Sequence, residues 1–97
     1  MDYSALIAKR RERFSELEDA VGDPDLFSDP KRATEILREH RRLKQTLDLW
    51  EKLEVTKRQL ADNQELAKSD DPEFSAMAAE EIPGLEAAIS TLSEDLQ

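Results

Sequence analysis

The stretch from Lys31 to Ala67 constrains the fold more than any other part of the sequence. It contains neither glycine nor proline, so the simplest prediction is one unbroken helix. At a rise of about 1.5 Å per residue, such a helix is roughly 55 Å long, which is more than a compact domain of this size needs. The rest of the chain is therefore expected to be arranged along this helix.

The mainly apolar positions of this stretch recur at intervals of three and four residues as far as Leu53, and then at two steps of seven. They are Ile36, His40, Leu43, Leu47, Trp50, Leu53, Leu60 and Ala67. On a helix, this stripe drifts by roughly 20° per seven residues, as a 3.5-residue repeat does. The drift predicts left-handed, coiled-coil-like packing against other helices of the same chain.

A shorter amphipathic helix is predicted for residues 3–21. Its inward positions follow helical spacing, with Arg10 at the one polar step, and they are Tyr3, Ile7, Phe14, Leu17 and Val21. Gly22 supplies a C-terminal stop, and Asp23-Pro24 prevents the helix from resuming.

A loop is expected over residues 22–30. Leu26 and Phe27 are too apolar to be left in water, so both are expected to plug the end of the helix pair. Asp29-Pro30 then starts the long helix, because the carboxylate can cap free N–H groups and proline loses no hydrogen bond at the first helical position.

Asp71-Pro72 repeats this start signal and opens a third helix over residues 72–97. Its stripe is Phe74, Met77 or Ala78, Glu81, Leu85, Ala88 or Ile89, Leu92 and Leu96. Pro83-Gly84 interrupts this helix, and a kink is expected rather than a break because the stripe keeps its phase on both sides.

The predicted fold class is all-α: an elongated, antiparallel, coiled-coil-like three-helix bundle in one helical domain, 1–97. The central helix of about 30–67 is flanked by helices of about 3–21 and 72–97, and the short loops make neighbours antiparallel.

The antiparallel arrangement predicts which residues pair. The first hairpin should place Leu17 near Ile36, Phe14 near Leu37 or His40, Ile7 near Leu47, and Tyr3 near Trp50. The second should place Phe74 near Leu66 or Ala67, Leu85 near Leu53, Ile89 near Trp50, and Leu92 near Leu47. Trp50 is expected to be buried where the hairpins overlap, between Tyr3 and Ile89.

Composition narrows the possible functions. The formal net charge is −9, but residues 30–68 carry ten Lys or Arg against seven acids, whereas residues 69–97 carry eight acids and no base. A protein that wraps free DNA or RNA is expected to be basic overall, so that class is disfavoured while a local phosphate contact is not. The sequence has no cysteine, so no disulfide framework is expected. We identify no signal peptide and no apolar run that approaches the ~20 residues of a membrane-spanning helix, so no contact with a membrane is expected.

No catalytic, cofactor or metal site is predicted. His40 is the single histidine, and its place on the inward stripe favours a packed side chain over a catalytic base. A second metal ligand of the His or Cys type is missing, and the two glycines cannot form a phosphate-binding loop. Trp50 is more consistent with a core anchor than with a platform on which a base stacks.

The one electrostatic feature with functional potential is the group Arg38, Arg41 and Arg42. Their i, i+3 and i+4 spacing puts them on one helix face. One interpretation is a solvated face paired with Glu35, Glu39 and nearby acids, and the other is a patch that faces phosphates. A second candidate surface is the acidic third helix, where Glu73, Glu80, Glu81 and Glu86 could meet a basic partner protein or serve only solubility.

Several motifs in order resemble the N-terminal helical domain of bacterial class I peptide chain release factors. The motifs are the run from Asp23 to Pro30 with Ala33 after it, the segment 43–50, and Asp71-Pro72-Glu73 followed by Met77-Ala78 and Glu80-Glu81. The last spacing looks closer to the type-one factor, which reads UAA and UAG. Pro83-Gly84 departs from the family pattern. The sequence still follows helical phase at Leu96, so the chain is expected to be the N-terminal fragment of a longer multidomain protein.

The resemblance implies a non-catalytic, cytoplasmic role. Family members read the stop codon with a tripeptide and trigger peptidyl-tRNA hydrolysis with a Gly-Gly-Gln motif, and both lie in later domains. The resemblance implies contacts of this domain with the large-subunit GTPase-associated centre, the stalk-base protein and rRNA. Together with the phosphate-facing interpretation of the arginines, it gives the hypothesis that Arg38, Arg41 and Arg42 form a ribosome-contact patch. The intramolecular pairing of the helices predicts a monomeric chain. The alternative hypothesis is a coiled-coil spacer or dimerisation module with no ribosomal role.

Overall fold

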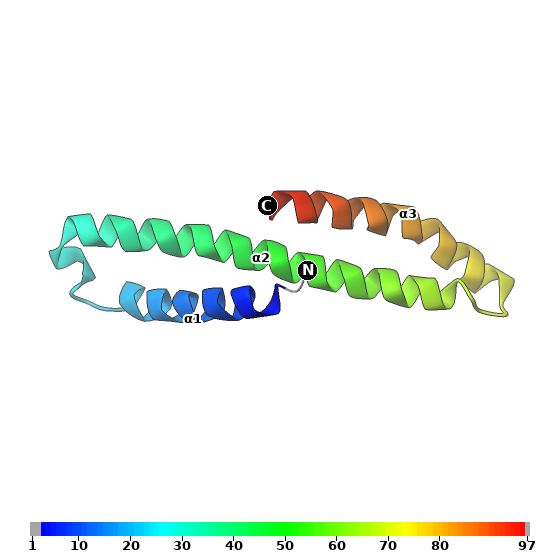
Figure 1. The fold of residues 1–97 in the computed structure, drawn as a ribbon, viewed down its shortest axis with the longest axis horizontal. Coiled ribbons are helices and arrows are strands. Elements are labelled where there is room, and N and C mark those ends of the chain that lie inside the picture. The colour runs from blue at the N-terminus through cyan, green and yellow to red at the C-terminus, as the bar shows by residue number, and fades with distance from the viewer. Residues whose placement is uncertain (1–2, 97) are drawn as a thin grey trace. The chain divides into compact units, whose positions relative to one another are not determined.

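The computed structural model describes residues 3–96, and its regular elements are helices (Figure 1). They are α1 (Ser4–Val21), a 3₁₀ turn (Leu26–Ser28), α2 (Pro30–Leu66) and α3 (Pro72–Asp95). The all-α prediction is therefore confirmed, and the long unbroken helix is real. The helix limits differ from the predicted ones by one or two residues, except that the 3₁₀ turn was expected to be loop.

The chain divides into two compact units that share α2. The first hairpin, as we call residues 3–48, pairs α1 with the first part of α2 in antiparallel orientation (Figure 1). The second hairpin, residues 49–96, pairs the rest of α2 with α3, also antiparallel (Figure 1). No helix among residues 3–96 is long and apolar enough to span a membrane.

Three helix residues form the buried centre between α1 and α2 in the first hairpin. They are Ile7 and Leu17 of α1 and Ala33 of α2. Around them lie half-buried side chains at the expected steps, namely Arg10, Phe14, Ile36, His40, Leu43 and Leu47. The rings of Phe14 and His40 stack with centroids 4.8 Å apart, so the predicted pairing of these two positions is confirmed.

The first loop buries only one of its two large apolar residues. Leu26 is fully buried (0% exposed), whereas Phe27 is 67% exposed, so the prediction that both plug the hairpin is wrong for Phe27. The 3₁₀ turn explains the difference, because consecutive residues of a tight helical turn point to different sides. The Asp23 carboxylate accepts a hydrogen bond from the N–H of Asp25 at 2.9 Å and holds the turn that follows α1.

Both predicted Asp-Pro helix starts are confirmed. The Asp29 carboxylate accepts from the N–H of Arg32 at 3.2 Å. The Asp71 carboxylate accepts from the N–H of Glu73 at 2.9 Å and from that of Phe74 at 3.5 Å. Each carboxylate satisfies N–H groups that have no partner within the helix, as an N-cap does.

The second hairpin is centred on Leu53 and Ala78, which are both buried. The half-buried residues around them include Thr56, Leu60 and Asn63 of α2, Ala67 directly after α2, and Ser75, Ile82, Leu85, Ile89 and Leu92 of α3. The apolar pattern did not reveal the polar steps Thr56 and Asn63.

The beginning of α3 packs differently from the prediction. Phe74 and Glu81 were expected on the inward stripe, but both are exposed. At the step where Met77 or Ala78 was expected, Ala78 is the buried residue and Met77 is exposed. The inward position is taken by Ser75, whose hydroxyl donates to the carbonyl oxygen of Ala67 at 2.7 Å. This bond holds the beginning of α3 against the end of α2 through Ser75, and the Phe74 ring is left exposed.

The Pro83-Gly84 pair lies inside α3, which continues through it to Asp95. The ribbon of α3 changes direction between its yellow beginning and its orange to red end (Figure 1). Proline removes one backbone hydrogen bond and clashes with the preceding turn, which bends a helix without ending it. The predicted kink is confirmed.

Trp50 is half-buried. The predicted overlap, in which Trp50 lies between Tyr3 and Ile89, joins residues of the two units and stays a prediction. The same holds for the Leu92–Leu47 pair.

Candidate functional site

The three arginines of the candidate patch lie together on α2 in the first hairpin. Arg38, Arg41 and Arg42 are all exposed. Because the half-buried Ile36 and His40 lie on the side of α2 that faces α1, the arginines present their guanidinium groups to solvent. We call these three residues the arginine patch.

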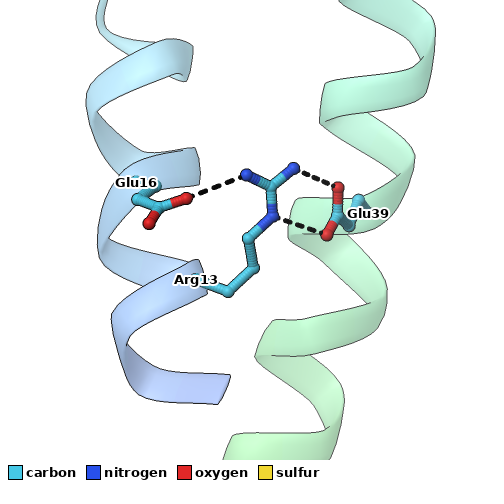
Figure 2. Close-up of polar contacts among 3 residues, drawn as sticks. All are labelled: Arg13, Glu16 and Glu39. Carbon is cyan, nitrogen blue, oxygen red and sulfur yellow. Dashed lines mark hydrogen bonds and ion pairs between the residues drawn. The ribbon is translucent and has the colours of Figure 1, made fainter. Parts of the chain in front are cut away.

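Glu39 is bound to α1 and not to the arginine patch. Its carboxylate accepts two hydrogen bonds from Arg13, at 2.8 Å from Nε and 2.7 Å from Nη2, and Arg13 also donates from Nη1 to Glu16 at 3.0 Å (Figure 2). The hydrogen bonds from Arg13 hold the pKa of Glu39 below its usual range. The same bonds, first to Glu39 and then to Glu16, raise the pKa of Arg13.

The arginine patch therefore keeps its positive charge available. None of its three side chains forms an ion pair or hydrogen bond with another residue in the described range 3–96. Lys44, the nearest other base along the helix, is paired with Asp48 at 3.5 Å. The interpretation in which Glu35 and Glu39 neutralise the patch is not what these contacts show.

His40 serves the packing of the hairpin. Its ring stacks on Phe14 at an interplanar angle of 22°, and its Nε2 lies 2.8 Å from Oε1 of Glu18. The prediction of a packed histidine is confirmed. The Arg13–Glu39 pair was missed from the sequence, because the predicted pairings followed only the inward stripe and both of these residues lie beside it.

The second hairpin differs strongly in charge. Residues 49–97 carry twelve acids and four bases, a net charge of 4 − 12 = −8, whereas residues 1–48 carry eleven acids and ten bases, a net charge of −1. Glu73, Glu80, Glu81 and Glu86 are all exposed on α3. Within the described part of the chain, no group of three or more His, Cys, Asp or Glu residues could hold a metal ion.

Comparison with known proteins finds relatives along the whole chain. The model of the PCRF domain matches residues 10–97. Peptide chain release factor 1 of Akkermansia muciniphila is 58% identical over 97 residues, which is 100% of this chain and 27% of that protein. Peptide chain release factor 1 of Nitratidesulfovibrio vulgaris is 35% identical over 85 residues, or 88% of this chain and 24% of that protein.

A third relative, peptide chain release factor 1 of Chlamydia trachomatis, is 36% identical over 86 residues, or 88% of this chain and 24% of that protein. The chain thus spans about a quarter of the length of the curated relatives it matches. No solved structure matches it. One family model covers nearly all of the sequence, and a relative is 58% identical over the full length of this chain. The chain therefore belongs to the PCRF domain family, as its resemblance to class I release factors predicted.

Proposed function

We propose that this chain is a non-catalytic domain of a peptide chain release factor and acts in translation termination in the cytoplasm. The observation that carries the proposal is the 58% identity, along the whole chain, to a protein named peptide chain release factor 1. The sequence contains no Gly-Gly-Gln motif, and its two glycines stand apart at positions 22 and 84. In this proposal, hydrolysis and codon reading belong to other parts of a full-length factor, and this domain contributes contacts with the large ribosomal subunit.

The proposal assigns the arginine patch to rRNA at the GTPase-associated centre. Guanidinium groups bind phosphate oxygens with paired, charge-assisted hydrogen bonds. Arg38, Arg41 and Arg42 are exposed, share a helix face and have no acidic partner within 4.0 Å among residues 3–96. They are suited to follow a phosphate backbone without reading its sequence. A neighbouring contact with the stalk-base protein belongs to the same proposal.

Ribosome pelleting tests this assignment. The variant Arg38→Gln, Arg41→Gln, Arg42→Gln removes three charges and keeps good helix formers at exposed positions. A matched control, Lys52→Gln, Lys57→Gln, Arg58→Gln, removes three charges from exposed positions of the same helix in the second hairpin. Circular dichroism verifies that both variants fold.

The expected result is weak, salt-sensitive co-sedimentation of the parent chain with ribosomes. The patch variant should lose most of this binding, whereas the control should retain it. Equal co-sedimentation of the patch variant and the parent would remove the arginine patch from the proposal.

The competing hypothesis of a dimerising spacer makes a different prediction. We propose that the chain is monomeric, because each hairpin already pairs α2 within the chain. Sedimentation equilibrium should give the monomer mass of 11.1 kDa across concentrations. A dimer that forms with rising concentration would support the spacer.

A further inference from the structure

The second hairpin carries apolar side chains that its own helices leave uncovered. Phe74 is 60% exposed, Met77 is 65% exposed and Leu66 is 49% exposed. We call these three residues the tip patch, because they flank the turn between α2 and α3. Large apolar side chains that gather at one exposed place are typical of a binding surface.

The three residues lie on one side of the hairpin. With about 100° per residue, Phe74 and Met77 precede the buried Ala78 by about 40° and 100° around α3, and Leu66 precedes the inward Ala67 by about 100° around α2. Because both helices are right-handed and antiparallel, positions that precede the inward residue lie on the same side of the pair. The bond between Ser75 and Ala67 keeps the two helix ends together.

Unpaired carboxylates surround the tip patch. One helical turn from Met77 are Glu73, Glu80 and Glu81, and one turn from Leu66 is Asp62. All four are exposed, and none has an ion-pair partner in the described range 3–96. We call these four carboxylates the acidic rim. They belong to the second hairpin, whose sequence has a net charge of −8.

We propose that the tip patch is a docking site for a basic amphipathic helix of a protein partner. The apolar face of that helix would cover Phe74, Met77 and Leu66, while flanking lysines or arginines would meet the carboxylates. Methionine adapts to varied partner surfaces, and an exposed aromatic ring beside it provides an anchor. The proposal does not depend on the ribosomal role, because it uses another hairpin and other chemistry.

The negative charge around the tip patch favours a basic helix over nucleic acid and over a second copy of the chain. Nucleic acid would bring phosphates to a surface of the same sign, which opposes binding. A second copy of the chain would bring an identical acidic rim against this one, since symmetric dimers pair the same patch. A helix with basic flanks is attracted by the rim, and its apolar side removes the tip patch from water.

The probe is an 18-residue helical peptide of leucine and lysine with all leucines on one face. Its control is a peptide of the same composition, shuffled so that it has no apolar face. The chain has two methionines, Met1 and Met77, so ¹³C-methyl methionine labelling gives two reporter signals. Titration with the amphipathic peptide should shift the Met77 signal.

The variant Phe74→Ser, Met77→Ser tests the surface directly. Both residues are exposed, so the variant should fold, which thermal unfolding checks. Fluorescence anisotropy of the labelled peptide should show an affinity loss of about tenfold or more. A matched control, Leu6→Ser, Leu37→Ser, removes two exposed apolar residues of the first hairpin and should leave the affinity unchanged.

Three outcomes would overturn the proposal. The shuffled peptide could bind as well as the amphipathic one, the serine variant could bind as well as the parent, or sedimentation could show a dimer that the serine variant abolishes. The arginine-patch variant serves as the separating control, since it should lose ribosome binding and keep peptide binding. Failure of either proposal is then seen without the other.

Discussion

Arg13 and Glu39 join α1 to α2 through two hydrogen bonds, Nε to Oε2 at 2.8 Å and Nη2 to Oε1 at 2.7 Å (Figure 2). On the adjacent residues of the two antiparallel helices, Phe14 stacks on His40. A polar contact and an aromatic contact in succession therefore fix the register of the first hairpin. The same arrangement occupies Glu39 and leaves the arginine patch unpaired.

The Arg13–Glu39 pair makes a prediction about acid stability. The pKa of Glu39 is lowered in the folded chain, so its contribution is complete above the unfolded value of about 4.3 and is lost as pH falls through the lower folded value. Glu39→Gln should therefore lower stability by the same small amount between pH 7 and about pH 5. The difference from the parent should begin to shrink below about pH 4.3 and should vanish once the pH is below the lowered folded pKa.

Denaturant unfolding at each pH measures this difference. Glu35→Gln is the control, because Glu35 is exposed and has no ion pair within residues 3–96. A stability difference for Glu39→Gln that stays constant down to pH 3 would contradict the assigned role. High salt should reduce the difference, since the pair is exposed.

The first loop offers a test with two neighbouring residues. Leu26→Ala should lower the free energy of unfolding by about 2–5 kcal/mol, because it leaves a cavity at a fully buried position. Phe27→Ala should change it by less than about 0.5 kcal/mol, since the ring is mostly in water. Equal effects in urea unfolding would mean that the loop packs differently.

The helix cap at Asp71 can be compared with its neighbour. Asp71→Ala removes the acceptor of two N–H groups and should cost about 1 kcal/mol. Asp70→Ala removes a charge of the same sign from an exposed position and should cost much less. Thermal unfolding of the two variants separates the cap from the charge.

Gly84 lowers the stability of α3 next to the bend, and this cost can be removed. A Cβ atom added to Gly84 would meet no atom within 4 Å, and its φ is not positive. Gly84→Ala should therefore raise the free energy of unfolding by about 0.5–1 kcal/mol. Ala87→Gly, at an exposed position of the same helix, should lower it by a similar amount, and a loss of stability in Gly84→Ala would contradict the packing described here.

Local chemistry made the helices predictable. Two local signals indicated the helices directly. No Gly or Pro interrupts residues 31–67, and an Asp-Pro pair stands at the start of α2 and of α3. The choice between Leu26 and Phe27 depends on the direction of a turn, and the choice between Phe74 and Ser75 depends on how closely two helix ends approach. The hydrophobicity of a residue indicates neither the direction of a turn nor the approach of two helix ends. Phe27 and Phe74 were therefore both predicted to face inward, and both are exposed.

The arginine patch was predictable only in part. Its shared face follows from the i, i+3, i+4 spacing, which holds on any helix. Its lack of acidic partners depends on a contact between residues 26 positions apart, Arg13 and Glu39. The predicted register, with Phe14 near Leu37 or His40, brings these two turns of helix together but does not specify that Arg13 reaches Glu39.

In the proposed function, Arg38, Arg41 and Arg42 contact phosphates of the ribosome. The most direct test is the salt dependence of ribosome affinity, measured by fluorescence anisotropy of the labelled chain from about 50 to 200 mM salt. The slope of log affinity against log salt should fall by about one for each lost contact, or about two to three in the triple glutamine variant, and should not change in the Lys52, Lys57, Arg58 control. A patch variant with the same slope as the parent would contradict the claim.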